Sequence, residues 1–467
     1  MNSSEQFKHY TEKVCEQIRW KKAHSVVAQE IENHLIDQKN AYMDMGDSES
    51  TAEEKALLQM GDPVAVGTAL DSTHKPVPQW GMIGLVMILF LLGAVIQFLF
   101  LKNILANTDF QGASMNTLII FLPFSLAVFF MAYFLDFSFF GKHPYILPIS
   151  IILIDVLTHF FGIWYGGDRW LHIGAFSLSP ASTSLLFPLA FCGFFYKLRE
   201  KGTQGYWLCG ILAACCCVIL LACHTMGGVI VFVCSAGLLM LVAAYKKWFS
   251  NGAKTVLALL IVIAVVCIFA FSFTAPFNYR LARMTAILHP ETDPSGAGYL
   301  SDILQNMIRN SVLIGEGTSF LDYDVTYAVM PSDFRSDFLL TYLTYKYGWI
   351  ISFTLVTLLA VFLIFGFRKC MKQKSILGQM VSLSILGAFI AEILLYVIAN
   401  LGYPLVAPIA LPFLSYGGTA LVIHMALAGI LLSVFRTGEV YRDSTKSVLD
   451  ENKFIQWDDG KLIISFK

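Results

Sequence analysis

The stretch GMIGLVMILFLLGAVIQFLFL, residues 81–101, decides the fold class, because it runs for 21 residues without a charged side chain. A helix of about twenty apolar residues is long enough to cross the ~30 Å hydrocarbon core of a bilayer. Similar runs recur through most of the chain, which is 56% hydrophobic and only 14% charged. This composition does not fit a soluble protein. It predicts an all-α polytopic membrane protein.

We expect about ten transmembrane helices, near residues 81–101, 117–135, 145–164, 181–196, 206–222, 226–245, 256–274, 346–367, 376–400 and 411–435. Short Lys and Arg clusters at 197–201, 246–254 and 368–374 then fall on one side of the membrane, which the positive-inside rule makes the cytoplasm. Both termini are therefore predicted to be cytoplasmic. The polar interval 277–338 becomes a large extracellular loop between helices 7 and 8.

Residues 1–80 differ from the rest, because they are charged and contain no run of membrane length. Apolar residues recur there at helical spacing, in the sets Phe7, Tyr10, Val14, Ile18 and Val27, Ile31, Leu35, Ile36. Gly46 is expected to end the second helix, and Ser50 with Glu53 to begin a third as a capping box. Gly61 ends that helix and Pro63 suits the first turn of a fourth. The sequence thus predicts a small cytosolic helical domain.

This segment resembles the short helical prefix domain found ahead of some bacterial permease-like membrane proteins, in which a Gly-Asp-Pro turn follows the third helix. Partner binding or regulation and a simple solubilising cap are both open as its role. Because these first residues are polar, we expect no cleavable signal peptide. At the other end, residues 437–467 form a polar tail in which Asp459-Gly460, between two apolar-rich runs, predicts a small hairpin.

The sequence argues against nucleic acid binding and against a metal site formed by the adjacent cysteines. Lys and Arg occur only in short clusters between apolar runs, so the chain lacks the basic face that nucleic acid binding needs. Most of the ten cysteines lie in or beside apolar runs and are expected to act as small buried hydrophobes. Cys215, Cys216 and Cys217 are adjacent, so on a helix they point about 100° apart and cannot converge on one metal.

The extracellular loop carries the residues best suited to chemistry. Asp337 stands where the next apolar run begins, between water and low-dielectric protein, which suits a carboxylate to proton abstraction. The alternative is that Ser336 and Asp337 simply form a helix N-cap. Arg283 and Arg280, with the turn at 290–294 and the glycines that follow, could bind a pyrophosphate. The alternative is that these prolines and glycines only shape a surface loop.

Ionisable residues inside apolar runs are costly and are treated as functional hypotheses. Asp155 and His159 lie four residues apart on one helical face, and Glu392 and His424 fall in later spans. A structural pair satisfied inside the bundle is an equally good interpretation of the first two. The string at 411–419, LPFLSYGGT, interrupts the last apolar run. It predicts irregular backbone that must be buried or line a cavity.

Four blocks in order resemble the SEDS family (shape, elongation, division and sporulation), the group of RodA, FtsW and SpoVE. They are Gly166 to Leu171 with Gly174 and Pro180, Tyr279 to Tyr299 with Gly315 and Gly317, Pro331 to Phe338 with Gly348, and Pro412 with Ser415 to Gly418. Together they cover a membrane domain from about residue 81 to 436.

The resemblance implies polymerisation of lipid II, or a similar undecaprenyl-pyrophosphate-linked sugar, at the outer face of the bacterial cytoplasmic membrane. It also implies a class B penicillin-binding protein as partner and leaves open a divalent cation, Mg²⁺ or Mn²⁺. Asp337 matches the family's essential acidic residue, proposed as the base that activates the acceptor hydroxyl. Substrate contacts are expected from Arg283, Arg280, Arg169, Trp170, Gly298, Tyr299, Ser415, Tyr416, Gly417 and Gly418.

The chain also departs from the family pattern. After Trp170 the family usually has a glutamate and, three residues later, a lysine, where this chain has Ser182 and Leu185. The family's Asp-Leu-Gly-Thr is replaced by Thr225-Met226-Gly227-Gly228. Three functions therefore stay open: a divergent glycosyltransferase, which we favour, a non-catalytic scaffold that recruits division or wall-synthesis proteins, and a transporter of lipid-linked precursors.

Overall fold

The computed structural model describes residues 3–107, 115–165, 168–174, 176–249, 277–293, 296–318, 336–406, 410–415, 417–438, 455–458 and 461–464. The chain divides into two compact units, of which the first contains the residues up to Gln79 and the second begins at Trp80. Among its described residues the first unit is helical, with α1 (Ser3–Glu16), the 3₁₀ turn η1 (Lys21–Ala23), α2 (His24–Asp44), α3 (Glu49–Met60) and α4 (Pro63–His74).

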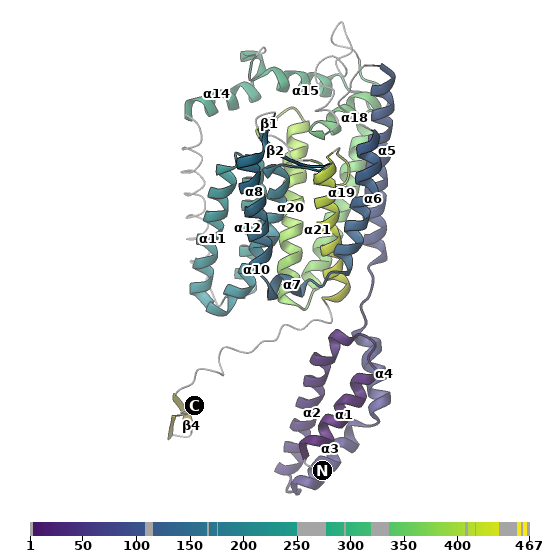
Figure 1. Cartoon of the computed structure of the whole chain (residues 1–467), viewed down its shortest axis with the longest axis vertical. Helices are drawn as coiled ribbons and strands as arrows, with labels where there is room; N and C mark the ends of the chain where they lie inside the picture. Colours follow the sequence, from purple (N-terminus) through teal and green to yellow (C-terminus); the bar gives the residue numbers. More distant parts are fainter. Residues whose placement is uncertain are drawn as a thin grey trace. The chain divides into compact units, whose positions relative to one another are not determined.

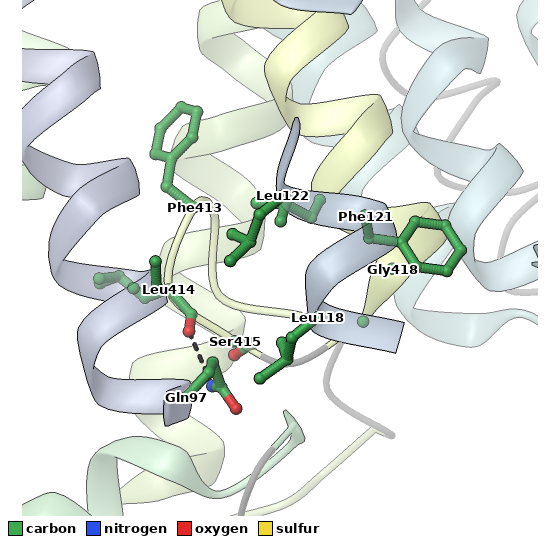
Figure 2. Close-up of a pocket in the computed structure, with 12 residues that line it drawn as sticks. Gln97, Leu118, Phe121, Leu122, Phe413, Leu414, Ser415 and Gly418 are labelled. Atoms are coloured by element: carbon green, nitrogen blue, oxygen red, sulfur yellow. Dashed lines mark hydrogen bonds between the residues drawn. The ribbon is translucent and has the colours of Figure 1, made fainter. Parts of the chain in front are cut away.

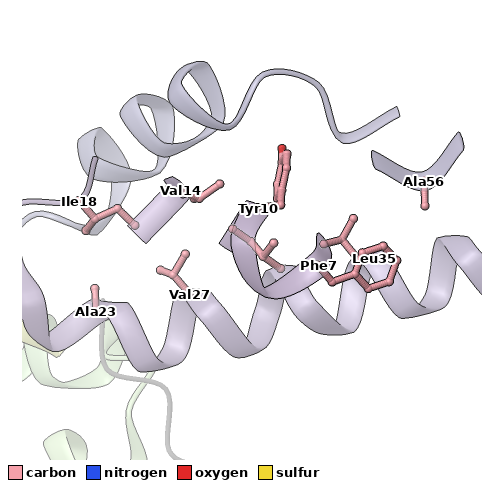
Figure 3. Close-up of a cluster of buried hydrophobic side chains, with 9 residues drawn as sticks. Phe7, Tyr10, Val14, Ile18, Ala23, Val27, Leu35 and Ala56 are labelled. Carbon is pink, nitrogen blue, oxygen red and sulfur yellow. The ribbon is translucent and has the colours of Figure 1, made fainter. Parts of the chain in front are cut away.

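The core of the first unit is formed by the apolar stripes that the helical spacing predicts. Figure 3 shows Val14 of α1 and Ile18, which follows that helix, in one cluster with Val27 and Leu35 of α2. Burying such side chains contributes about 1.5–3 kcal/mol each. The prediction is wrong for Ile36, which is 43% exposed. It lies one position beyond Leu35, and a rotation of about 100° carries it away from the core.

Two helix boundaries in this unit agree with the predicted signals. Gly61 has a φ of +82°, a conformation that favours glycine, and it caps α3. Pro63 is the first residue of α4, and the Asp62 carboxylate accepts a hydrogen bond from the Ala65 N–H at 3.0 Å.

The predicted start of α3 is wrong by two residues. The N-cap is Ser48 rather than Ser50, and its side chain accepts a hydrogen bond from the Thr51 N–H at 3.4 Å. Ser48 has the extended backbone that an N-cap requires, whereas Ser50 already lies inside the helix. Both serines satisfy the local preference, so composition could not separate them.

An ion pair joins α4 to the residues after α1. A guanidinium nitrogen of Arg19 lies 2.8 Å from the Asp71 carboxylate, which also accepts from the Arg19 main-chain N–H at 2.9 Å. The hydrogen bond from the Arg19 side chain holds the pKa of the Asp71 carboxyl below its usual range.

The described elements of the second unit are α5 (Trp80–Asn107), α6 (Met115–Phe134), α7 (Ser138–Lys142), α8 (Ile146–Phe161), β1 (Ile163–Tyr165), β2 (Asp168–Ile173), β3 (Phe176–Leu178), α9 (Pro180–Thr183), η2 (Ser184–Leu186), α10 (Phe187–Leu198), η3 (Arg199–Lys201), α11 (Gly202–Ala222), α12 (Met226–Tyr245), α14 (Phe277–Leu288), η4 (Pro290–Thr292), α15 (Tyr299–Arg309), α18 (Leu339–Tyr347), α19 (Trp349–Lys372), α20 (Ile376–Asn400), α21 (Gly418–Thr437), β4 (Ile455–Asp458) and β5 (Lys461–Ile464). Figure 1 shows the long apolar helices side by side, with α14, α15, α18 and the β1–β2 hairpin at one end of the bundle.

Six described helical segments are long and apolar enough to cross a membrane. One of them, Pro180–Ala222, covers two predicted spans, and the shorter apolar helices Leu118–Phe134 and Ile146–Phe161 coincide with two more. The chain is therefore a multi-pass helical membrane protein. The predicted span at 256–274 lies outside the described residues, so the expected count of ten is not confirmed.

Helices α12 and α20 pack closely against each other. A Cβ on Gly387 would lie 2.9 Å from the Cα of Ser235 in α12, and the Ser235 hydroxyl donates to the Ser384 carbonyl at 2.7 Å. Small residues of this kind let two helix backbones approach closely inside a membrane. α20 thereby becomes a fixed internal axis of the bundle.

The eighth predicted span, 346–367, begins at the wrong residue. Lys346 belongs to α18, which ends at Tyr347 with Gly348 as its C-cap, and the long helix α19 starts only at Trp349. Gly348 has a φ of +95°, and a Cβ there would lie 2.5 Å from the Leu313 carbonyl oxygen. The Trp349 N–H donates to the Val312 carbonyl at 3.1 Å, so a distant part of the loop breaks the helix.

A three-stranded antiparallel sheet follows α8 and was not predicted. Strand β1 pairs with β2, with Trp164 opposite Arg169, and β2 pairs with β3. The predicted span 145–164 is therefore too long at its end, because α8 stops at Phe161. The C-terminal hairpin is confirmed, since β4 and β5 pair with Asp458 opposite Lys461.

Candidate functional site

Asp337 is half-buried and precedes Phe338, the N-cap of α18, at the end of the bundle that also holds α14 and α15. The helix N-cap interpretation of this residue is wrong, because the N-cap of α18 is Phe338, without a side-chain cap. What the structure fixes is the main chain. The Asp337 carbonyl accepts a hydrogen bond from the Asn400 side-chain amide at 2.9 Å. The Asn400 Oδ1 accepts in turn from the Thr341 N–H at 3.0 Å.

The residue before Asp337 is held by two hydroxyls from different elements. The Tyr396 hydroxyl of α20 donates to the Ser336 carbonyl at 2.7 Å, and the Ser415 hydroxyl lies 2.8 Å from the same oxygen. The Tyr396 oxygen also accepts from the Leu339 N–H at 3.1 Å. Buried polar groups with all their partners form a rigid network. The network here fixes the backbone on both sides of Asp337.

Ser415 belongs to the interrupted stretch before α21, which begins at Gly418 rather than at the predicted residue 411. The described residues 411–415 are non-helical and buried, as the sequence predicted for this string. The Ser415 Oγ accepts from the Leu411 N–H at 2.9 Å. In Figure 2 the Gln97 side chain of α5 donates to the Leu414 carbonyl at 2.9 Å. The turn therefore links α5, α20 and the Asp337 segment.

A small apolar groove lies beside this turn (Figure 2). Leu118, Phe121 and Leu122 of α6 form one wall, and Leu414 and Ser415 form part of the other. Gly417 and Gly418 also line the groove, whereas Tyr416 lies outside the described residues. A Cβ on Gly418 would lie 2.6 Å from the Phe121 ring, so close helix packing already requires glycine there.

The predicted anion site in the loop has a compact turn at its centre. The Asp293 carboxylate accepts from the Ala297 N–H at 2.8 Å, and the Asp293 carbonyl accepts from the Gly298 N–H at 3.1 Å. These amides are thus used inside the turn. A Cβ on Gly298 would lie 2.8 Å from the Pro290 carbonyl oxygen, which explains that glycine by packing.

The two loop arginines lie on α14, before this turn. Arg283 is exposed, and the side chain of Arg280 is outside the described residues. Tyr299, at the start of α15, is 39% exposed. On the other side of α15, Leu304 and Met307 are buried, as expected of a helix seated on the bundle.

Arg169 and Trp170 lie on β2, next to a second pocket. The Arg169 guanidinium donates to the His159 carbonyl and stands 5.8 Å from the centre of the Trp164 ring. The Thr419 hydroxyl of α21 donates to the Ser177 carbonyl of β3 at 2.7 Å. This bond ties the sheet that carries Arg169 to the helix that follows Ser415.

The intramembrane ionisable residues separate into two sets. His424 of α21 lies 2.9 Å from the Glu392 carboxylate of α20, and both side chains are buried. Asp155 is buried, whereas His159 on the same helix is exposed. The Thr183 hydroxyl donates to Asp155 at 2.7 Å.

Ser182 and Leu185, the positions where the family resemblance led us to expect a glutamate and a lysine, are also buried. Ser182 is 9% exposed and Leu185 is 1% exposed. Ser182 lies in α9, the helix that provides Thr183 to Asp155. Neither side chain can supply a charge to the interior of the bundle.

Within the described part of the chain, no group of three or more His, Cys, Asp or Glu residues could hold a metal ion. The adjacent thiols diverge as expected, since Cys215 is exposed, Cys216 is half-buried and Cys217 is buried. The expectation that cysteines act as buried hydrophobes is wrong for Cys215 and also for Cys234, which is exposed. Cys267 lies outside the described residues.

The most informative omission of the sequence interpretation is the pair Tyr396 and Asn400. They follow Glu392 at intervals of four residues in α20, so all three share one helical face. Polar residues at that spacing in an apolar helix are the signal that could have revealed them.

The fold and the site together define a multi-pass helical membrane protein. At one end of its bundle the main chain of Asp337 is held by hydrogen bonds, and an apolar groove lies beside Ser415. Residues 79–439 match the FtsW, RodA and SpoVE family, described as Cell cycle protein. The chain belongs to this family.

Named relatives agree with the family match. Stage V sporulation protein E of Bacillus subtilis is 26% identical over 295 residues, which cover 61% of this chain and 76% of that protein. Peptidoglycan glycosyltransferase MrdB of Escherichia coli is 26% identical over 309 residues, which cover 63% of this chain and 78% of that protein.

Two solved structures share the fold. One is a chain of a peptidoglycan synthase complex, with a TM-score of 0.60 and 21% identity. The other is the Rod shape determining protein RodA of Thermus thermophilus, with a TM-score of 0.52 and 18% identity. Each match covers 79% of this chain and 99% of the solved chain.

Proposed function

We propose that this protein is a peptidoglycan glycosyltransferase that polymerises lipid II at the outer face of the cytoplasmic membrane, with Asp337 as its general base. The observation that carries the proposal is the fixed main chain around Asp337, where Asn400, Tyr396 and Ser415 hold the carbonyls of residues 336 and 337. Rigid placement of a base within reach of its proton is what general base catalysis requires. The name of the relative MrdB supports the same activity.

The chemistry needs one proton acceptor and stabilisation of a leaving pyrophosphate. The acceptor sugar hydroxyl loses its proton to the Asp337 carboxylate while its oxygen forms a bond to the anomeric carbon of the donor sugar. The bond from that carbon to the pyrophosphate oxygen breaks, and undecaprenyl pyrophosphate leaves. Arg283, Arg280 and Arg169 are the proposed counter-charges, since guanidinium groups bind phosphate oxygens in pairs.

The groove in Figure 2 supports a lipid-linked substrate. Its wall of Leu118, Phe121 and Leu122 suits an isoprenoid chain, and Ser415 connects the groove to the main chain at Ser336. In this arrangement the sugar end of the substrate lies toward Asp337. Trp170, Gly298, Tyr299, Tyr416, Gly417 and Gly418 belong to the same proposed substrate site.

The proposal includes cytoplasmic termini, a prefix domain at residues 1–80, a membrane domain at 81–436, an extracellular loop at 277–338 and a cytosolic tail at 437–467. A class B penicillin-binding protein is the proposed partner, in line with the structural neighbour from a peptidoglycan synthase complex. Single cysteines placed in residues 3–79 and in the loop, and labelled from outside intact cells, test the orientation. The loop cysteine should react and the prefix cysteine should not.

One observation favours a transporter of lipid-linked precursors as the second candidate. The buried pair of Glu392 and His424 lies 2.9 Å apart inside the bundle, a place where ionisable groups often serve transport. A flipping assay in proteoliposomes separates the two functions. Flipping without polymerisation would favour the transporter.

The direct test is glycan strand formation by purified protein, with and without its penicillin-binding partner, using lipid II and gel separation of products. We expect strands longer than the disaccharide. Protein that binds lipid II but never extends it under either condition contradicts the proposal and favours the non-catalytic scaffold.

A further inference from the structure

A second pocket opens beside the β1–β2 hairpin. Its walls come from α8, the hairpin, the start of α9 and the turn between α11 and α12. The polar side chains that line it are Asp155, His159, Arg169 and His224, and Trp164 and Pro180 are also in its wall.

The Asp155 carboxylate lacks a partner for one of its oxygens. The residue is only 3% exposed, and its Oδ1 accepts from the Thr183 hydroxyl at 2.7 Å. Its Oδ2 has no hydrogen-bond partner among the described residues. A buried acceptor left unsatisfied costs about 1–3 kcal/mol, and more when it is charged. When the carboxylate is ionised, an N–H or O–H donor from outside the described residues would satisfy this oxygen.

The Arg169 side chain contributes donors to the pocket, and the two histidine rings contribute nitrogens that donate or accept according to their tautomer. Arg169 carries five N–H donors, of which one contacts the His159 carbonyl. The imidazoles of His159 and His224 add further ring nitrogens. The positive charge of the Arg169 guanidinium disfavours binding of a metal cation in the pocket, and the described residues offer no group of three metal ligands. A simple anion is opposed by Asp155.

The complementary ligand carries N–H or O–H donors at one end and anionic oxygens at the other, which is the chemistry of a phosphorylated amino sugar. We propose that this pocket binds the sugar-phosphate end of the lipid-linked substrate, with Asp155 accepting from a sugar N–H or O–H and Arg169 contacting phosphate. This inference rests on the proposed function. The bond from Thr419 to the Ser177 carbonyl keeps the hairpin in register with the turn that holds Ser415.

Asp155 is thus a substrate-binding residue that the family pattern does not predict. It accepts a 2.7 Å hydrogen bond from Thr183, the residue after Ser182 in α9, so the pocket joins α8 to α9.

Binding of two probes to the purified full-length protein tests the proposal. Lipid II carries the sugars, and undecaprenyl pyrophosphate lacks them. Asp155→Asn keeps an oxygen for Thr183 and replaces the other with a donor, so it should weaken lipid II binding at least tenfold and change undecaprenyl pyrophosphate binding less than twofold. Arg169→Ala should weaken both. Asp136→Asn is the matched control, because Asp136 accepts from the Ser138 N–H far from the pocket, and it should change neither.

Equal binding of lipid II by wild type and Asp155→Asn overturns the inference, as does equal weakening of both probes. If Asp155→Asn does not fold, wild-type protein with lipid II that carries a photoreactive group on its sugar decides the question. Crosslinks to peptides containing residues 155–169 support the pocket, and crosslinks confined to other peptides contradict it. Failure of the wild type to polymerise lipid II would overturn the proposed function while leaving these binding results readable.

Discussion

The side-chain amide of Asn400 donates to the main-chain carbonyl of Asp337 at 2.9 Å, across a separation of 63 residues in the sequence. Asn400 ends α20, which is packed against α12 through Gly387 and Ser235. The main chain of the proposed base is therefore held by a buried helix of the bundle as well as by the loop that contains it.

Asn400→Ala should lower both stability and activity. It removes the hydrogen bonds that the Asn400 side chain makes to the Asp337 carbonyl and the Thr341 N–H, at a cost of about 1–3 kcal/mol each. We expect a lower thermal midpoint in detergent and at least a tenfold loss of lipid II polymerisation. Asn310→Ala is the control, because Asn310 is the half-exposed C-cap of α15. It should change the thermal midpoint and the polymerisation rate by much less. An Asn400→Ala protein as active as the wild type would show that this bond does not position the base.

Tyr396 and Ser415 should be energetically coupled, because their hydroxyls share the Ser336 carbonyl. Either Tyr396→Phe or Ser415→Ala leaves one hydroxyl on that oxygen, whereas the double variant leaves neither. The loss of stability in the double variant should exceed the sum of the single losses by about 0.5–3 kcal/mol. Equilibrium unfolding of the four proteins in one detergent measures this. Strict additivity would mean that the two hydroxyls act independently.

Gly417 and Gly418 can be separated by the same substitution. Gly418→Ala places a Cβ 2.6 Å from the Phe121 ring, so overpacking should cost about 1–3 kcal/mol. Gly417→Ala meets only Ala420 at 3.4 Å and should leave the thermal midpoint nearly unchanged. If Gly417→Ala nevertheless weakens lipid II binding, Gly417 contacts substrate. Equal destabilisation by both substitutions would contradict the packing argument.

The Arg19–Asp71 pair should make the first unit less stable in acid. Because the folded-state pKa of Asp71 is lowered, its contribution is present above the ordinary aspartate pKa of about 3.9 and is lost as pH falls through the lower folded value. Asp71→Asn should therefore increase hydrogen exchange of residues 3–79 near pH 7. Its difference from wild type should shrink as the pH falls below about 4. A difference that stays constant from pH 7 to pH 3 would exclude this ionisation as its source.

The spans could be predicted because the bilayer imposes a local rule, that about twenty apolar residues must follow one another. That rule did not predict the helix break at Gly348, because the break depends on close contact with the Leu313 carbonyl, which is distant in sequence. The β1–β2 hairpin was missed although Gly166-Gly167 separates two short runs rich in aromatic and branched residues, a recognised hairpin signal.

The candidate site was partly predictable for the same reason. Asp337 could be predicted from the sequence, because it is an acidic residue at the edge of an apolar run. Tyr396 and Asn400 were not predicted, because their function depends on segments about sixty residues away in sequence. Asp155 could be nominated from sequence, but only the structure reveals the unpartnered oxygen that gives it a specific role.

The central claim is tested most directly by Asp337→Asn in a lipid II polymerisation assay. This change keeps the shape of the side chain and the main-chain bond to Asn400 while removing the base. It should therefore lower polymerisation by about 100-fold or more with lipid II binding unchanged. Asp302→Asn, in the first turn of α15, is the control and should remain active. An Asp337→Asn protein that polymerises lipid II as fast as the wild type would contradict the account.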